Sequence, residues 1–238
     1  MSTSEVMDLS ADRDRLDRAS TAERVAGILR ERITDGSLRS GARLSEEAVT
    51  EALEISRNTL REAFRLLAHE RLLVHRLNRG VFVREISAED VADIYRARRL
   101  LECSAAHSVN RRTLSGAAEG LAAAELAVTA AEKAARRGVW SEVATADVRF
   151  HQAIASLAGS ARLNELMAAV GAELRLVFHT MPDTRGFHEP YLPRNREILD
   201  RLAAGDGRGA AVLLGSYLDD AESALLKHLA GSQSPDSR

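Results

Sequence analysis

The spacing of apolar residues divides the chain into a first part with helices and a hairpin and a longer part with helices alone. In the first part, apolar residues recur every three or four positions, which is typical of one face of an amphipathic helix. This first stripe consists of Val25, Ile28, Leu29 and Ile33. Serine is a favourable N-cap, so Ser45 and Ser56, each followed by a periodic apolar run, predict the starts of two further helices.

After the third predicted helix, the pattern changes from a helical period to that of strands. Val81 and Val83 are β-branched and follow a turn signal at Asn78-Arg79-Gly80, which predicts a short antiparallel hairpin. Three helices, the last of them basic, followed by a hairpin form the order of a winged helix-turn-helix. We therefore predict a DNA-binding domain over residues 20–86, preceded by a flexible arm over residues 1–19.

Strand signals are absent from the sequence after residue 86. Six helical segments are predicted there, each with an apolar stripe, near residues 88–111, 115–136, 139–158, 161–180, 190–204 and 206–230. Such helices can bury a common core as an antiparallel bundle. The predicted fold class is mainly α, with a winged helix-turn-helix followed by an all-α bundle over residues 87–230 and a disordered tail over residues 231–238.

Composition and charge narrow the class of protein. The chain has 45% hydrophobic and 29% charged residues, which excludes a wholly disordered chain. Its net charge of -2 is unremarkable, but residues 56–84 hold seven arginines and two glutamates, an excess of five positive charges. This local excess indicates one module that meets phosphate. A single Cys103, no signal peptide and no long apolar run predict a soluble cytoplasmic protein.

Motifs at consistent spacing cover most of the chain. In the winged part they are L-S-E at 44–46, I-S-R-N-T-L-R-E-A at 55–63, L-L-V at 72–74 and N-R-G-V-F-V at 78–83. On these motifs the module resembles the GntR family of bacterial regulators. The helical part resembles the FCD effector domain of the FadR-type branch. The residues that carry this second resemblance are D-I-Y at 93–95, Arg98, L-E at 101–102, D-V-R-F-H at 147–151, L-A-G-S at 157–160, Gly205-Asp206 and Ala210.

The resemblance implies a homodimeric transcription regulator, expected to be a repressor, whose operator affinity changes when a small molecule binds. Arg57 and Arg61 share one helix face, and a guanidinium suits guanine or a phosphate, while Asn58 can recognise adenine. A solvated basic face is the alternative for an isolated helix. Glu62 is expected to pair with a neighbouring arginine. The expected DNA-binding residues are Arg57, Asn58, Thr59, Arg61, Arg79 and Gly80.

A candidate metal site follows from Asp147 and His151, which lie four residues apart and point the same way on a helix. A carboxylate and an imidazole so placed can hold a divalent metal with two further ligands. The metal-binding members of the family supply two histidines for this purpose, and here Asn195 and Tyr217 stand in their places. The resemblance therefore implies a zinc, nickel or manganese site that is incomplete.

A polar pocket that binds an organic effector directly is the alternative use of the same residues. Its hydrogen-bonding groups would be Asp147, His151, Asn195 and Tyr217. Arg98 matches a family position that faces this cavity, where it can pair with a carboxylate-bearing effector. His179 is a further candidate for the pocket wall.

Two other classes of function were weighed against a regulator. One is a metal-dependent hydrolase or lyase in the helical part, but the sequence shows no set of nucleophile, base and orienting group. It also lacks the P-loop and dinucleotide glycine patterns, so we expect no enzyme. The other is a structural module whose winged domain docks protein rather than DNA.

Overall fold

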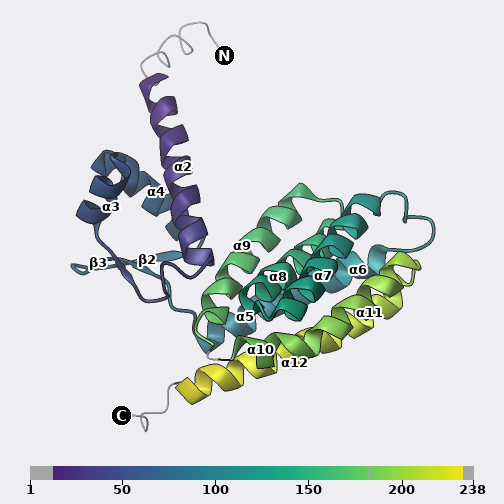
Figure 1. Cartoon of the computed structure of the whole chain (residues 1–238). Helices are drawn as coiled ribbons and strands as arrows, with labels where there is room; N and C mark the ends of the chain where they lie inside the picture. The colour runs from purple at the N-terminus through teal and green to yellow at the C-terminus, as the bar shows by residue number, and fades with distance from the viewer. Residues whose placement is uncertain (1–12, 182, 233–238) are drawn as a thin grey trace, which may run out of the picture. The chain divides into compact units, whose positions relative to one another are not determined.

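The chain divides between Glu85 and Ile86 into two units, which we name the winged unit and the helical unit. The computed structural model describes residues 13–181 and 183–232 (Figure 1). Residues 1–12 of the predicted arm and residues 233–238 of the predicted tail lie outside the described residues. The prediction of a flexible arm is wrong for residues 13–19, because these residues belong to α2 (Arg13–Thr34). No glycine or proline interrupts residues 13–26, so nothing in the sequence stops the helix there.

The winged unit contains three helices and a small sheet, which confirms the predicted winged helix-turn-helix. After α2 come β1 (Arg43–Leu44), α3 (Glu46–Leu53), α4 (Arg57–His69), β2 (Leu73–Arg76) and β3 (Gly80–Val83). The strand order is β1-β3-β2, and both pairings are antiparallel. Strand β1 was not predicted, because a strand of two residues is too short to show an alternating pattern.

The starts of α3 and α4 follow the predicted caps. The side chain of Ser45 accepts a hydrogen bond from the backbone of Ala48 at 3.3 Å, and that of Ser56 accepts one from Thr59 at 3.1 Å. The predicted core position at Ile28 is wrong, since this side chain is 44% exposed. The alanines Ala22 and Ala26 are buried and move the packed stripe of α2 to the side away from Ile28.

The helical unit is a bundle, as predicted, with additional short turns (Figure 1). Its long helices are α7 (Ala118–Arg137), α8 (Trp140–Ser156), α9 (Ala161–Phe178), α11 (Leu192–Ala203) and α12 (Gly207–Ser232). The first predicted helix is instead α5 (Ala88–Arg98), a π-helical turn η2 (Arg99–Cys103) and α6 (Ser104–Ser108). The region predicted as a break before residue 190 contains α10 (Thr184–His188) and η3 (Glu189–Tyr191).

Helix α8 is central to the packing of this unit. Ten of its seventeen residues are buried, and it contacts η2, α6, α7, α9 and α10. Apolar side chains from all the long helices join one core cluster around it. Two of the buried residues of α8 are polar, Asp147 and His151, and the fold therefore places both in the interior. None of the helices within residues 13–181 and 183–232 is long and apolar enough to cross a membrane.

The start of α12 depends on the absence of a side chain at Gly207. A Cβ atom there would lie 2.2 Å from the Val109 carbonyl oxygen and 2.3 Å from that of Ala106. Gly207→Ala is therefore expected to destabilise the protein by about 1–3 kcal/mol, measured by urea unfolding. Gly215→Ala in the same helix is the control, because nothing lies within 4 Å of its added Cβ. That change should stabilise the protein by about 0.5–1 kcal/mol, and equal effects at both positions would contradict the account.

Candidate functional site

Helix α4 presents its polar residues on the surface of the winged unit. Arg57 and Asn58 are exposed, and their side chains have no hydrogen-bond or ion-pair partner among the described residues. Arg61 is 60% exposed and contacts Glu46 of α3 through its Nε atom at 3.2 Å. Arg65 pairs with Glu62 at 3.0 Å, as expected for Glu62. Exposed pairs of this kind are weak, so these guanidinium groups stay available to phosphate or a base edge.

Thr59 is less available than the other predicted residues of α4. It is half-buried, and its hydroxyl lies 2.8 Å from the hydroxyl of the N-cap residue Ser56. Thr59 therefore helps to form the N-cap of α4, the helix from which Arg57 and Asn58 project.

The turn between β2 and β3 forms the tip of the wing. Asn78 and Gly80 have positive φ angles of 58° and 102°, a conformation that asparagine and glycine adopt most readily. Arg76 is held along the hairpin by Glu85 at 2.6 Å and by the ring of Phe82, 4.6 Å from its guanidinium carbon. The Arg79 side chain is exposed and has no partner among the described residues, so its guanidinium is available at this tip.

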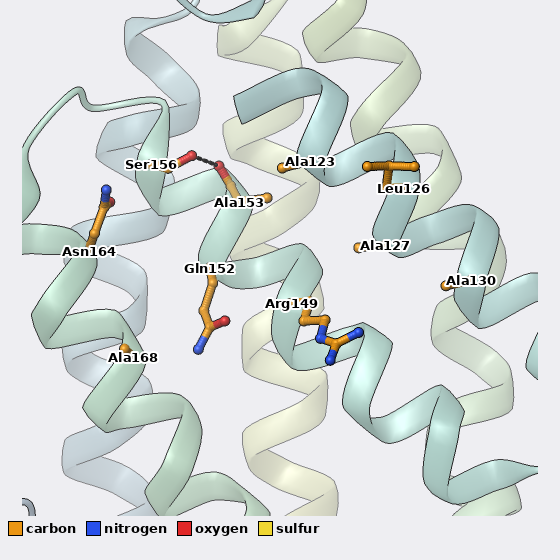
Figure 2. A pocket seen from close by; sticks show the side chains of 10 residues that line it. All are labelled: Ala123, Leu126, Ala127, Ala130, Arg149, Gln152, Ala153, Ser156, Asn164 and Ala168. Atoms are coloured by element: carbon orange, nitrogen blue, oxygen red, sulfur yellow. Dashed lines mark hydrogen bonds between the residues drawn. The ribbon is translucent and has the colours of Figure 1, made fainter. Parts of the chain in front are cut away.

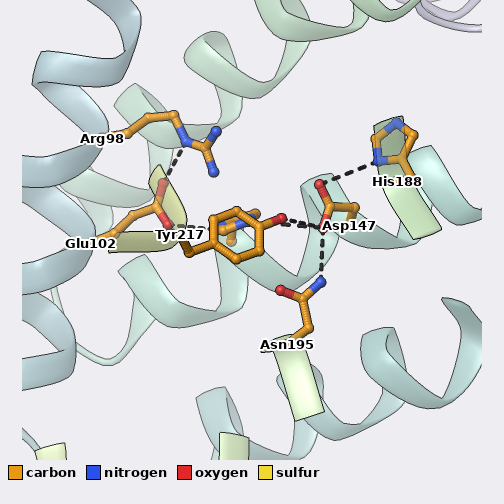
Figure 3. Close-up of polar contacts among 7 residues, drawn as sticks. Arg98, Glu102, Asp147, His188, Asn195 and Tyr217 are labelled. Carbon is orange, nitrogen blue, oxygen red and sulfur yellow. Dashed lines mark hydrogen bonds and ion pairs between the residues drawn. The ribbon is translucent and has the colours of Figure 1, made fainter. Parts of the chain in front are cut away.

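A buried group of polar side chains occupies the interior of the helical unit (Figure 3). We name it the polar centre, and it consists of Arg98, Glu102, Asp147, His151, His188, Asn195 and Tyr217. The structure thus brings together all five residues predicted for effector binding. It adds Glu102 and His188, which were not predicted as site residues.

Arg98, Glu102 and His151 form one chain of contacts. The Nε atom of Arg98 donates to Glu102 Oε1 at 2.8 Å, and His151 Nδ1 lies 2.5 Å from Glu102 Oε2. Glu102 is 0% and Arg98 3% exposed. Burial alone would raise the pKa of Glu102, but the charges of Arg98 and then His151 outweigh it and hold that pKa below its ordinary value. Glu102 is therefore an ionised acceptor that orients both neighbours.

Asp147 is held by the two residues that stand at the family's histidine positions. Asn195 Nδ2 and the Tyr217 hydroxyl both donate to Asp147 Oδ1, at 2.8 and 2.9 Å. Burial opposes the charge of Asp147, but His151 and then the Asn195 hydrogen bond lower its pKa below the ordinary value. Burial, and then the charge of Asp147, raise the pKa of Tyr217 well above its ordinary value, so its proton stays in place.

His188 of α10 is the buried residue whose bonding is least complete. It is 1% exposed, and neither ring nitrogen has a hydrogen-bond partner. Its Nδ1 atom lies 3.9 Å from Asp147 Oδ2, an ion-pair distance rather than a hydrogen bond. Burial lowers the pKa of His188, although the charge of Asp147 partly opposes this. The ring is therefore neutral near pH 7.

The donor set does not fit the divalent metal that the resemblance implies. Asn195 and Tyr217 satisfy the Asp147 carboxylate with hydrogen bonds, and neither is a strong metal ligand in its neutral form. Among the described residues, no group of three or more His, Cys, Asp or Glu side chains is placed to hold a metal ion. We derive no chemistry through a metal at this site.

Three of the cavities in the described part of the helical unit differ in character. One of about 10 Å³ is lined by Arg98, Asp147 and His151 of the polar centre and by Phe178. A second, of about 130 Å³, is also lined by Phe178 and includes the predicted wall residue His179. A third of about 550 Å³ is an open groove between α7, α8 and α9 (Figure 2). Five of its ten lining residues are alanines and its only charged lining residue is Arg149, so we assign the polar centre, not the groove, to ligand recognition.

Sequence reasoning missed Glu102 and His188 as site residues for different reasons. Glu102 follows Arg98 by four residues on a predicted helix, a spacing that already places the two on one face. This signal was present and could have been used. His188 lies in the segment predicted as a break, where no periodicity indicates which side chains point inward.

Family models and relatives agree on one class of protein. A model described as bacterial regulatory proteins, gntR family, matches residues 21–83, and the FCD domain model matches residues 93–220. The gluconate operon transcriptional repressor of Bacillus subtilis is 42% identical over 88 residues, which are 37% of this chain and 35% of that repressor. The match thus spans about a third of that relative's length.

Two longer matches cover both units. The "Probable D-xylose utilization operon transcriptional repressor" of Paenarthrobacter nicotinovorans is 29% identical over 83% of this chain and 85% of that protein. The crystal structure of a protein assigned as a GntR transcriptional regulator, from Rhodococcus sp. RHA1, is 49% identical, with a TM-score of 0.80. It aligns with 87% of this chain and 98% of its own. These relatives are regulators and not enzymes, so the metal-dependent enzyme considered from the sequence is set aside.

Proposed function

Because the chain belongs to the GntR family of bacterial regulatory proteins and carries an FCD domain, we propose that it is a repressor controlled by a small carboxylate-bearing effector. The winged unit binds operator DNA, and the effector binds in the polar centre and changes the affinity for that DNA. As a regulator of transcription, the protein acts in the cytoplasm, as a homodimer. Two winged units then meet two half-sites on one duplex.

The observation that carries the effector part is the bonding of Arg98. Glu102 binds only its Nε edge, so the two terminal nitrogens have no protein partner among the described residues. A buried guanidinium with one free edge can hold a carboxylate through two parallel hydrogen bonds. Arg98 also lines the cavity of the polar centre, which supports a ligand-binding role for this edge.

We propose further that the effector is recognised directly, without a metal ion. Asp147 is already satisfied by Asn195 and Tyr217, and the site presents hydrogen-bonding groups of both kinds. Ligands in such pockets are oriented by a few convergent polar groups within an apolar wall. The wall here includes Val148, Met167 and Leu174.

The effector proposal is tested with the purified, untagged full chain. Small molecules released on denaturation are identified by mass spectrometry and added back to a fluorescence titration of DNA from the chain's own upstream region. Operator affinity is expected to change in wild type and to be unaffected by the same molecule in Arg98→Lys, which keeps the charge but loses the planar fork. A full response in Arg98→Lys would contradict the proposal.

The homodimer is tested separately by analytical ultracentrifugation. The sedimenting species should have twice the 25.9 kDa mass of the chain.

Operator binding itself gives a separate prediction. Arg61→Ala is expected to weaken binding by about 1–3 kcal/mol if the guanidinium makes a bidentate base contact, and to relax the preference for one base pair. The matched control is Arg162→Ala, which removes an exposed arginine of α9 in the helical unit. A gel-shift titration in which Arg61→Ala and Arg162→Ala both bind like wild type would remove Arg61 from the DNA contacts.

A further inference from the structure

We propose that the polar centre recognises a second group on its ligand, a hydroxyl or ammonium donor beside the carboxylate, and that His188 helps to bind it. This inference rests on the proposed function and makes it more specific. A ligand that carried only a carboxylate would leave the buried hydrogen-bond acceptors of the polar centre without a donor.

The polar centre contains buried hydrogen-bond acceptors that the protein itself leaves without a donor. Asp147 Oδ1 accepts two hydrogen bonds, but no donor lies within hydrogen-bond distance of its Oδ2 atom among the described residues. Asn195 donates a hydrogen bond from Nδ2 to Asp147, and its Oδ1 atom is buried and has no partner. Both atoms can only accept, so what binds them must donate.

His151 adds a further buried atom without a partner. Its Nδ1 atom lies 2.5 Å from Glu102 Oε2 and donates to that carboxylate. The other ring nitrogen, Nε2, is buried and has no partner, so it can bind a polar atom of a ligand. His151 Nε2 lies 3.9 Å from Asp147 Oδ1, which is too far for a hydrogen bond. The two atoms are nevertheless close enough to contact the same polar group of a ligand.

His188 contributes two more buried atoms without partners, its two ring nitrogens. Its ring contacts Phe178 and Phe187 edge-on, with ring centroids 4.9 Å apart in both pairs, so a phenylalanine would suit the same packing. Two buried nitrogens without partners reduce stability. A histidine whose purpose was packing would gain nothing from them. We infer that a ligand supplies these partners, with one ring nitrogen able to donate and the other to accept.

The two cavities beside Phe178 provide the space. The cavity of the polar centre, about 10 Å³, has room for about one water molecule. The neighbouring cavity of about 130 Å³ shares Phe178 as a wall and includes Arg175 and Thr184. The proposal requires the Phe178 side chain, which lines both cavities, to rotate so that the two cavities join. A ligand of a few carbon atoms could then place its polar end against Arg98 and Asp147.

The test uses four probes of the same carbon skeleton with the full chain: butanoate, 2-hydroxybutanoate, 2-aminobutanoate and 1,2-butanediol. Affinities are measured by NMR, from the shifts of the histidine ring signals. At least one of the two acids that carry a donor should bind about 10-fold more tightly than butanoate, the gain expected for a hydrogen bond to a charged acceptor. The hydroxy and amino acids separate the two kinds of donor. The diol tests whether the carboxylate is needed.

His188→Phe distinguishes a ligand-binding residue from a structural one. The variant should lose most of the preference over butanoate, while its Tm rises by about 2–4 °C because two unpaired buried nitrogens are removed. His107→Phe is the control, since His107 is exposed on α6, and it should change neither property. A structural histidine would give the opposite result, a lower Tm with the preference intact.

The outcomes separate this inference from the proposed function. If butanoate binds as tightly as the hydroxy and amino acids, and Arg98→Lys abolishes that binding, the proposed function stands and the donor inference is overturned. It is also overturned if the preference persists in His188→Phe, or if none of the probes binds. In the last case the response of the operator complex to the co-purified molecule still decides the proposed function. Binding of the diol without butanoate would instead contradict the carboxylate part of the proposed function.

Discussion

Replacing Glu102 by leucine is expected to lower the free energy of unfolding of the helical unit by about 3–5 kcal/mol. The substitution leaves Arg98, 3% exposed, as a buried charge without its partner, and His151 loses the acceptor of its Nδ1 proton. Removing one member of a buried ion pair costs more than the pair contributed, because the desolvation of the remaining charge is no longer offset. Urea unfolding monitored by circular dichroism measures the effect.

A second ion pair of the same spacing provides the control. Arg185 and Glu189 also lie four residues apart and form two hydrogen bonds, at 3.0 and 2.9 Å, but their side chains are 63% and 50% exposed. Glu189→Leu should therefore change stability little. The double change Arg98→Met with Glu102→Leu should recover most of the stability lost in Glu102→Leu. If Glu102→Leu lowers the free energy of unfolding no more than Glu189→Leu does, the buried Arg98–Glu102 pair does not have the expected effect on stability.

Local signals were sufficient to predict the winged unit. Ser45 and Ser56 cap the helices that they were predicted to cap, and the hairpin pairs around Asn78-Arg79-Gly80. Each of these features depends on residues within a few positions of one another, so a single sequence contains the information. Strand β1 depends on its pairing with β3, about forty residues away, and its sequence alone therefore does not reveal it.

The polar centre could be predicted only in part. The resemblance indicated Asp147, His151, Asn195 and Tyr217 as neighbours, and the structure places the last two within hydrogen-bond distance of Asp147. It did not indicate how they bond, because that depends on the relative depth of α8, α11 and α12 in the bundle. The position of His188 follows from a short helix whose five residues show no helical period. Tertiary packing, rather than local sequence, determines its burial.

The absence of two histidines from the polar centre leads to the second large expected effect, a gain of metal binding. The double change Asn195→His with Tyr217→His should raise the affinity for Zn²⁺ by on the order of 10³-fold or more over wild type. The side chains at both positions already reach Asp147, so the new set would be one carboxylate and three imidazoles. Zinc prefers such a set over neutral amide and phenol groups. Calorimetric titration of untagged protein with Zn²⁺, supported by elemental analysis, measures it.

Glu102 should add to this gain in zinc affinity. A histidine that binds a metal usually donates its other ring proton to a carboxylate, which fixes the ring, and Glu102 already does this for His151. The control is Asn195→Leu with Tyr217→Phe, which removes the same two hydrogen bonds to Asp147 without adding a ligand and should not gain zinc. If wild type already binds one zinc ion tightly, direct recognition of the effector is wrong. If the double histidine variant folds but binds no zinc, Asn195 and Tyr217 do not occupy ligand positions, and their contacts with Asp147 have another origin.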